Sequence, residues 1–136
     1  MPMNIAQRQP DASTVALWPT ADETCLIMDA PGALALVASL PVTPNVVLTT
    51  LSLLDQPMLQ SVAPTRVVIP LIGPRFDAVQ ALTRLAELRF SGIVCILTGP
   101  LPAPGLVRAE LAHIAPGMTV HLIKIDHRGM PSAACA

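Results

Sequence analysis

The chain contains 136 residues, of which 52% are hydrophobic, 12% are charged and 2% are aromatic, and its formal net charge is −1. This length favours a single domain, whose core has to be aliphatic. A near-neutral chain with no basic stripe and almost no aromatic residues to stack on bases argues against direct nucleic-acid binding. Its three cysteines have unrelated spacings, which argues against a disulfide framework or a zinc site. The N-terminus lacks the apolar run of a signal peptide, so we expect a cytoplasmic protein.

The charged fraction is roughly half that of a typical globular domain. A surface so poor in charge leaves apolar area exposed, which predicts a protein–protein interface. One uncharged stretch, 30–54, is long enough to span a bilayer. Pro31, Pro41 and Pro44 interrupt it, so a helix followed by a strand is favoured over a membrane span, and we expect no membrane association.

Residues 1–22 show no clear period and predict an irregular N-terminal extension. Strands and helices then alternate along the chain. Short apolar runs predict five strands, at 24–29, 45–50, 67–69, 92–97 and 120–125. The segments between them predict four helices, at 31–40, 52–63, 77–90 and 104–115.

The helix boundaries follow from the residues at their starts. Pro31 suits the first turn of its helix, and Pro57 is tolerable only near the start of the next one. Asp77 precedes the clearest helix, and Gln80 three positions later makes a capping-box-like pair with it. The alternation of elements predicts a parallel sheet with helices on both faces and right-handed crossovers.

After the fifth strand, Gly129, Pro131 and the short remaining length argue against a final helix. We therefore expect a domain over 23–127, preceded by the extension and followed by a mobile tail over 128–136. Cys25 and Cys95 lie inside predicted strands, where a free cysteine acts as a small hydrophobic residue.

Four positions fall at the carboxyl ends of predicted strands: Asp29, Pro70, Thr98 and Lys124. In a parallel sheet these ends lie on one edge, where functional groups gather. A carboxylate, a hydroxyl and an ammonium together suit a metal-bridged phosphate. Each also has a structural interpretation: Asp29 as a cap for the helix at Pro31, Thr98 as a turn hydroxyl, Lys124 as a solvated strand end and Pro70 as a rigid strand terminator.

The order of these positions resembles the receiver domain of bacterial response regulators. In that family an acidic pair ends strand one, a phosphoryl-accepting Asp ends strand three, a Thr or Ser ends strand four and a Lys ends strand five. The stretch PLIGPRFDA is similar to the family pattern D-x-x-x-P-x-M-D-G. The matching residues are Pro74, Phe76, Asp77 and Ala78 in this stretch, Asp29 in MDA, Thr98 in CILTG, and Lys124 in GMTVHLIKI. The resemblance covers about residues 24 to 126 and implies a flavodoxin-like three-layer sandwich with strand order 2-1-3-4-5.

The departures from the family pattern concern its chemistry. Pro70 falls on the phosphoacceptor, Ala30 on the second acid and Ile125 on the usual proline. Phosphoryl transfer needs a nucleophile and a Mg²⁺ held by carboxylates, and a single carboxylate is a poor Mg²⁺ site. The resemblance therefore implies a degenerate receiver with a vestigial pocket at Asp29, Pro70, Thr98 and Lys124. We expect no catalytic residue, metal or cofactor, and hence no enzyme.

The predicted function is regulation in bacterial signalling through protein–protein interaction, without phosphorylation. The first helix is apolar almost all round and needs cover from the N-terminal extension, from a second copy of the chain or from another protein, and we favour a homodimer. Two alternatives stay open. One is a small flavodoxin-like ligand-binding protein or enzyme using the edge with Asp29, Thr98, Gly99 and Lys124. The other is an accessory subunit docked permanently in a larger complex.

Overall fold

The computed structural model describes residues 21–40, 42–125 and 131–134. The strands are β2 (Thr24–Met28), β3 (Asn45–Thr49), β4 (Arg66–Pro70), β5 (Ile93–Thr98), β6 (Thr119–Ile125) and β7 (Pro131–Ala134). The helices are α2 (Pro31–Ala38), α3 (Gln56–Val62), α4 (Ala78–Glu87) and α5 (Pro104–Ile114), with a short 3₁₀ turn η1 (Leu51–Leu53) before α3.

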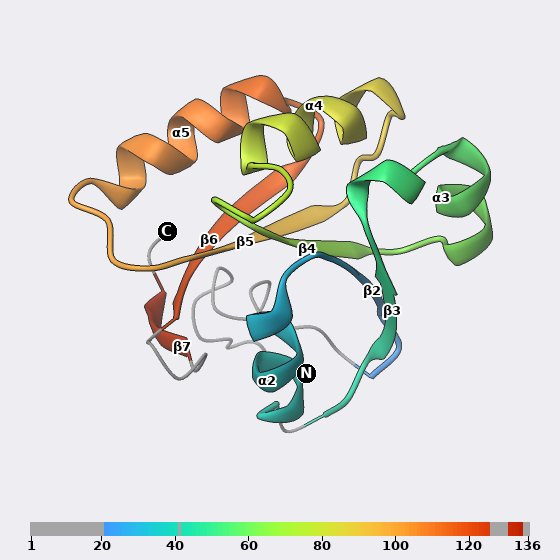
Figure 1. Ribbon diagram of the computed structural model, residues 1–136, viewed down its shortest axis with the longest axis horizontal. Coiled ribbons are helices and arrows are strands. Elements are labelled where there is room, and N and C mark those ends of the chain that lie inside the picture. The colour runs from blue at the N-terminus through green and yellow to red at the C-terminus, as the bar shows by residue number, and fades with distance from the viewer. Residues whose placement is uncertain (1–20, 41, 126–130, 135–136) are drawn as a thin grey trace, which may run out of the picture.

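The strands form one sheet in the order β3-β2-β4-β5-β6-β7. The first five pair in parallel, and their order is the predicted 2-1-3-4-5. Helices α3, α4 and α5 lie over one face of the sheet and α2 lies over the other (Figure 1). The fold is therefore the flavodoxin-like three-layer sandwich that the sequence predicted.

The sixth strand, β7, pairs antiparallel with β6 and was not predicted. It lies inside the stretch 128–136, for which we expected a mobile tail. Residues 1–20 of the predicted extension over 1–22 lie outside the described residues, as do 41, 126–130 and 135–136.

The core has two layers because successive strand residues point to opposite faces. Alternate residues of the central strands, such as Leu26, Val67 and Ile96, pack against α3, α4 and α5. The residues between them, such as Ile27 and Val68, pack against α2. The strands β2, β4, β5 and β6 carry buried residues on both faces, which is why they appear in the sequence as continuous aliphatic runs, whereas the edge strand β3 is partly exposed.

Two helix boundaries differ from the prediction by three residues or more, and the others differ by two residues at most. The helix expected over 52–63 begins at Gln56, because Asp55 caps it by accepting a hydrogen bond from the backbone N–H of Met58. Pro57 accordingly sits in the first turn. The helix after Asp77 ends at Glu87 rather than at residue 90. The capping box is confirmed: Asp77 Oδ1 accepts from the N–H of Gln80, and the Gln80 side chain accepts from the N–H of Asp77, both at 2.9 Å.

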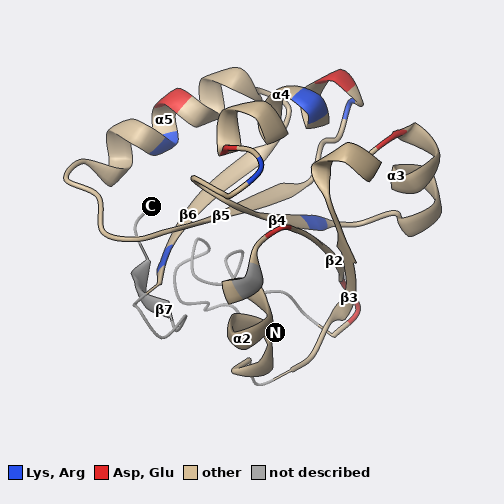
Figure 2. Ribbon diagram, in the orientation of Figure 1, with Lys and Arg blue, Asp and Glu red and all other residues tan. Residues whose placement is uncertain are grey.

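The uncharged stretch 30–54 divides into α2, β3 and η1, as a helix followed by a strand. In the part of the chain that the structure describes, no helix has the length and apolarity that crossing a bilayer requires. Charged residues are sparse on the described elements, and α2 and β3 carry none (Figure 2).

Candidate functional site

The carboxyl edge of the sheet carries the four predicted positions on four neighbouring strands. Asp29 follows β2, Pro70 ends β4, Thr98 ends β5 and Lys124 lies near the end of β6. Thr98 and Lys124 are register partners, and Pro70 pairs with Leu97, the residue before Thr98. The structure thus brings the four to one edge.

Pro70 leads into a tight loop held by backbone hydrogen bonds. Leu71 N–H donates to the Leu97 carbonyl, and Ala78 N–H donates to the Leu71 carbonyl, both at 2.9 Å. Within the loop, Gly73 N–H donates to the carbonyl of Phe76 at 2.9 Å. A Cβ on Gly73 would lie 2.9 Å from both that carbonyl oxygen and Cγ of Pro70, so the close turn requires glycine. These hydrogen bonds tie the loop to β5 and to the start of α4, and the last residue of β4 before the loop is a proline ring without a nucleophilic atom.

Asp29 pairs with Arg75 of this loop. Arg75 Nη1 donates to Asp29 Oδ1 at 2.8 Å, and the Asp29 side chain is 11% exposed against 70% for Arg75. The cap proposed for Asp29 is wrong: the N-cap of α2 is Ala30, which makes no side-chain cap hydrogen bond. Asp29 itself has φ of 48°, in the left-handed region that aspartate tolerates better than most residues.

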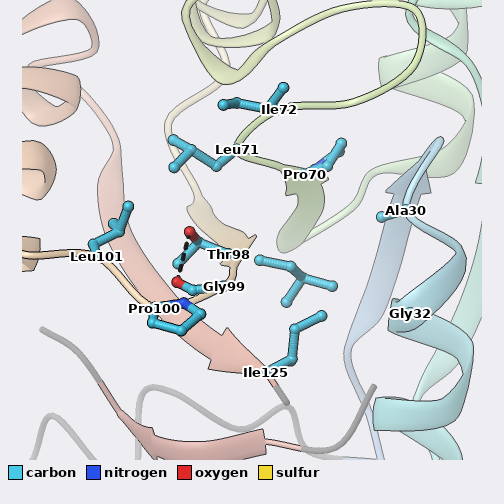
Figure 3. Close-up of a pocket in the computed structure, with 11 residues that line it drawn as sticks. Ala30, Gly32, Pro70, Leu71, Ile72, Thr98, Gly99, Pro100, Leu101 and Ile125 are labelled. Atoms are coloured by element: carbon cyan, nitrogen blue, oxygen red, sulfur yellow. Dashed lines mark hydrogen bonds between the residues drawn. The ribbon is translucent and has the colours of Figure 1, made fainter. Parts of the chain in front are cut away.

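Thr98 directs its hydroxyl into its own turn. The side chain is buried, and Oγ1 donates to the Gly99 carbonyl at 3.0 Å (Figure 3). This contact agrees with the interpretation of Thr98 as a turn hydroxyl. Lys124, its register partner, is half-buried.

Three of the four predicted positions line hollows at this edge, with Pro70 and Thr98 in one hollow and Asp29 in another. The larger one has a volume of about 470 Å³ and lies beside the end of β4 (Figure 3). It is lined mostly by apolar groups, from Ala30, Gly32, Pro70, Leu71, Ile72, Leu97, Thr98, Gly99, Pro100, Leu101 and Ile125. Pro70 and Thr98 therefore share a hollow that neither Asp29 nor Lys124 lines.

Asp29 lines a second hollow of about 360 Å³ on the β3 side of the sheet. Its other lining residues are Ile27, Ala30, Leu34, Leu48, Thr49, Pro74 and Arg75. Two buried oxygens of this hollow, Asp29 Oδ2 and Thr49 Oγ1, have no hydrogen-bond partner within the described structure. Such atoms are commonly satisfied by ordered water.

The donor set at this edge does not fit Mg²⁺. Among the described residues it offers one carboxylate, that of Asp29, and the guanidinium of Arg75 already occupies one oxygen of that carboxylate. The described residues 21–40, 42–125 and 131–134 contain no group of three His, Cys, Asp or Glu side chains placed to hold a metal ion. Magnesium is coordinated by several oxygens in near-octahedral geometry, which this arrangement does not supply.

Sequence reasoning missed two features. Arg75 occupies a variable position between Pro74 and Phe76, so no motif identified it as the partner of Asp29. The second feature is Arg66 at the amino end of β4, which is 2% exposed. Its Nε lies 3.0 Å from Glu23 Oε1, and Nη1 donates to Cys95 Sγ at 3.5 Å.

The two buried thiols beside Arg66 are held in the protonated form. Burial raises the pKa of the Cys25 thiol to about 11, although the nearby guanidinium of Arg66 opposes the shift. Burial also raises the pKa of Cys95. Both thiols are therefore inert in the folded protein, in agreement with the prediction for residues inside strands.

The comparisons with known proteins found similarity among solved structures. No family model matches the chain, and no curated protein matches it. Among solved structures, it is similar to the signal receiver domain of the response regulator NarL from Mycobacterium tuberculosis. The TM-score is 0.49 at 13% sequence identity, over 76% of this chain and 85% of that domain.

Proposed function

We propose that this chain is a receiver-like regulatory protein of the bacterial cytoplasm that acts through protein–protein interaction and is not phosphorylated. The observation that carries the proposal is the state of the carboxyl edge. Its strand order and loop match the receiver pattern, yet Pro70 stands at the acceptor position and Arg75 pairs with Asp29, the acid that the described part of this edge provides. Phosphoryl transfer to this edge lacks both its nucleophile and its Mg²⁺ ligands.

The positions of the acid, the hydroxyl and the lysine argue against the alternative that this chain is an enzyme. The acid, the hydroxyl and the lysine that such an enzyme would combine do not line one pocket. The pocket that Thr98 does line is apolar, and its hydroxyl is engaged with the Gly99 carbonyl. We therefore propose no catalytic residue and no cofactor.

Phosphorylation is tested directly with acetyl phosphate and Mg²⁺, followed by intact-mass spectrometry. We expect the mass to be unchanged, and beryllofluoride with Mg²⁺ to leave the amide NMR spectrum unchanged. A receiver domain with its acceptor aspartate, treated in parallel, shows that the reagents are active. A mass gain of one phosphoryl group on this chain would overturn the proposal.

The partner surface in this proposal is the face formed by α2 and β3. Neither element carries a charge, and Leu34 and Leu48 are exposed and both line the smaller hollow. Among the described strands β3 pairs only with β2, so its outer edge is open to pairing. We propose that a second copy of the chain occupies this face, because two such edges pair across a twofold axis.

Light scattering across a dilution series tests this interface. We expect a dimer that Leu34→Glu and Leu48→Glu each convert to a monomer, since both place a charge in the apolar contact. Leu106→Glu on the outer face of α5 is the matched control, because Leu106 is also exposed but lies on the opposite side of the sheet. A monomer at all concentrations would contradict the homodimer.

A further inference from the structure

The face of the sheet that α2 covers extends beyond this helix toward the amino ends of the strands. Cys25 lies two residues before Ile27, and Arg66 lies two residues before Val68, so both side chains share the face of the α2 cluster. The same face carries His121 on β6, the register partner of Cys95. Helix α2 has eight residues and is about 12 Å long.

The side chains at this end are buried more deeply than α2 explains. Cys25 is 1% exposed and Arg66 is 2% exposed. Cys25 nevertheless belongs to neither of the two apolar clusters that connect the sheet to its helices. Among residues 21–40, 42–125 and 131–134, α2 is the only helix on this face (Figure 1). Burial of a guanidinium and a thiol requires further atoms over them.

We propose that the N-terminal segment, residues 1–20, docks on this face over Cys25, Arg66 and Cys95. The described chain begins at Ala21, two residues before Glu23, whose carboxylate pairs with Arg66. The segment therefore joins the domain at the amino ends of the strands, beside the face that needs cover.

The segment has the length and the side chains for this position. Twenty residues reach about 66 Å when extended and about 30 Å when helical, whereas a six-stranded sheet is about 24 Å wide. Val15, Leu17 and Trp18 precede the domain and supply the apolar surface. The described C-terminal strand lies elsewhere, because β7 (Pro131–Ala134) pairs with Ile123 and Ile125 at the carboxyl end of β6.

This cover is distinct from the proposed dimer surface, since it concerns the amino ends of β2, β4 and β5 rather than the outer side of α2 and β3. Its failure and the failure of the dimer are therefore separately observable. The docked state has two independent reporters, because docking covers Trp18 of the segment and the two thiols of the sheet face at once.

Trp18 is the first reporter, because it is the single tryptophan of the chain. In the native protein we expect a blue-shifted emission and acrylamide quenching several-fold weaker than in urea. Equal quenching in the native and the unfolded protein would overturn the proposal. The proposal would also be overturned if dilution dissociated a dimer, seen by light scattering, and at the same time removed the protection of Trp18 from acrylamide. That result would assign the cover to a second copy of the chain.

Thiol labelling is the second reporter, measured in a Cys135→Ser background so that only Cys25 and Cys95 react. A chain that starts at Ala21 should label at least tenfold faster than the full chain at pH 8. Equal labelling of the two chains, with the circular dichroism of the truncated one retained, would contradict the docking.

If the truncated chain unfolds, the thiol labelling is measured instead on the full-length variant with both Leu17→Ala and Trp18→Ala. This variant should also label several-fold faster while it keeps its circular dichroism, because it loses the apolar contacts of the segment without losing the segment. Leu106→Ala is the matched control and should label at the wild-type rate. Labelling of the double variant at the rate of this control would overturn the proposal.

Discussion

Arg75 and Asp29, 46 residues apart in the chain, form an ion pair at the carboxyl edge of the sheet, with Arg75 Nη1 2.8 Å from Asp29 Oδ1. Since the Arg75 side chain is 70% exposed, solvent screens the pair. Arg75→Ala should lower the free energy of unfolding by about 0.2–1 kcal/mol, and less at high salt. Urea titrations in low and high salt measure both effects. A loss above about 2 kcal/mol would show that the pair holds the loop, which its backbone hydrogen bonds argue against.

The backbone of Asp29 makes a separate prediction. Its φ of 48° is accessible to asparagine and glycine but costs a β-branched residue about 1–2 kcal/mol. Asp29→Val should therefore be less stable than Asp29→Asn by at least that amount, although both remove the carboxylate. Thermal unfolding of the two variants measures this difference, which contains the backbone contribution and the hydrogen bond from Arg75 that the asparagine oxygen still accepts. Equal midpoints would contradict the left-handed conformation.

The capping box at α4 provides a third prediction. Asp77→Ala leaves the N–H of Gln80 without its acceptor and should cost about 1 kcal/mol. Glu87→Ala near the end of the same helix is the control, because its ion pair with Arg84 is exposed and its removal should cost about 0.5 kcal/mol or less. Chemical denaturation gives both values, and a reversed order of the two would contradict the assignment of the cap.

Arg66 should be far more sensitive than any surface arginine. Arg66→Ala leaves a cavity in the sheet and a largely buried carboxylate on Glu23, and loss of one partner of a buried pair costs about 3–5 kcal/mol. Circular dichroism during denaturation measures the change. Arg75→Ala is the comparison, and similar losses for the two variants would mean that Arg66 is solvated in solution.

The raised pKa of Cys25 predicts an alkaline dependence of stability. The unfolded thiol ionises near its ordinary value of 9.0, whereas burial holds the folded thiol neutral up to about 11. The contribution is therefore complete below pH 9 and is lost as the pH rises toward 11, because only the unfolded state releases its proton in this window. Urea titrations from pH 8 to pH 10.5 should show a shallower decline for Cys25→Ala than for wild type. Parallel declines would contradict the burial of the thiol.

Periodicity and local chemistry predicted most of the fold. Buried parallel strands are continuous aliphatic runs, and Asp77 with Gln80 marks a helix start, because these signals arise from neighbours in the chain. Helix α3 begins at Gln56, four residues after its predicted start at 52, because Asp55 is the residue that caps it. Strand β7 was not predicted, because a short strand of small residues has no hydrophobic pattern of its own. Its formation depends on pairing with the edge of β6.

The candidate site also has features that the sequence predicted and features that depend on tertiary contacts. The sequence by itself determined that Asp29, Pro70, Thr98 and Lys124 end neighbouring strands, since this follows from the order of the elements. Only the tertiary structure decided what those side chains touch. It pairs Asp29 with Arg75, turns Thr98 onto Gly99 and separates the acid from the pocket at Pro70. These contacts depend on loop conformation and on residues 46 positions apart, and they therefore leave no periodic trace in the sequence.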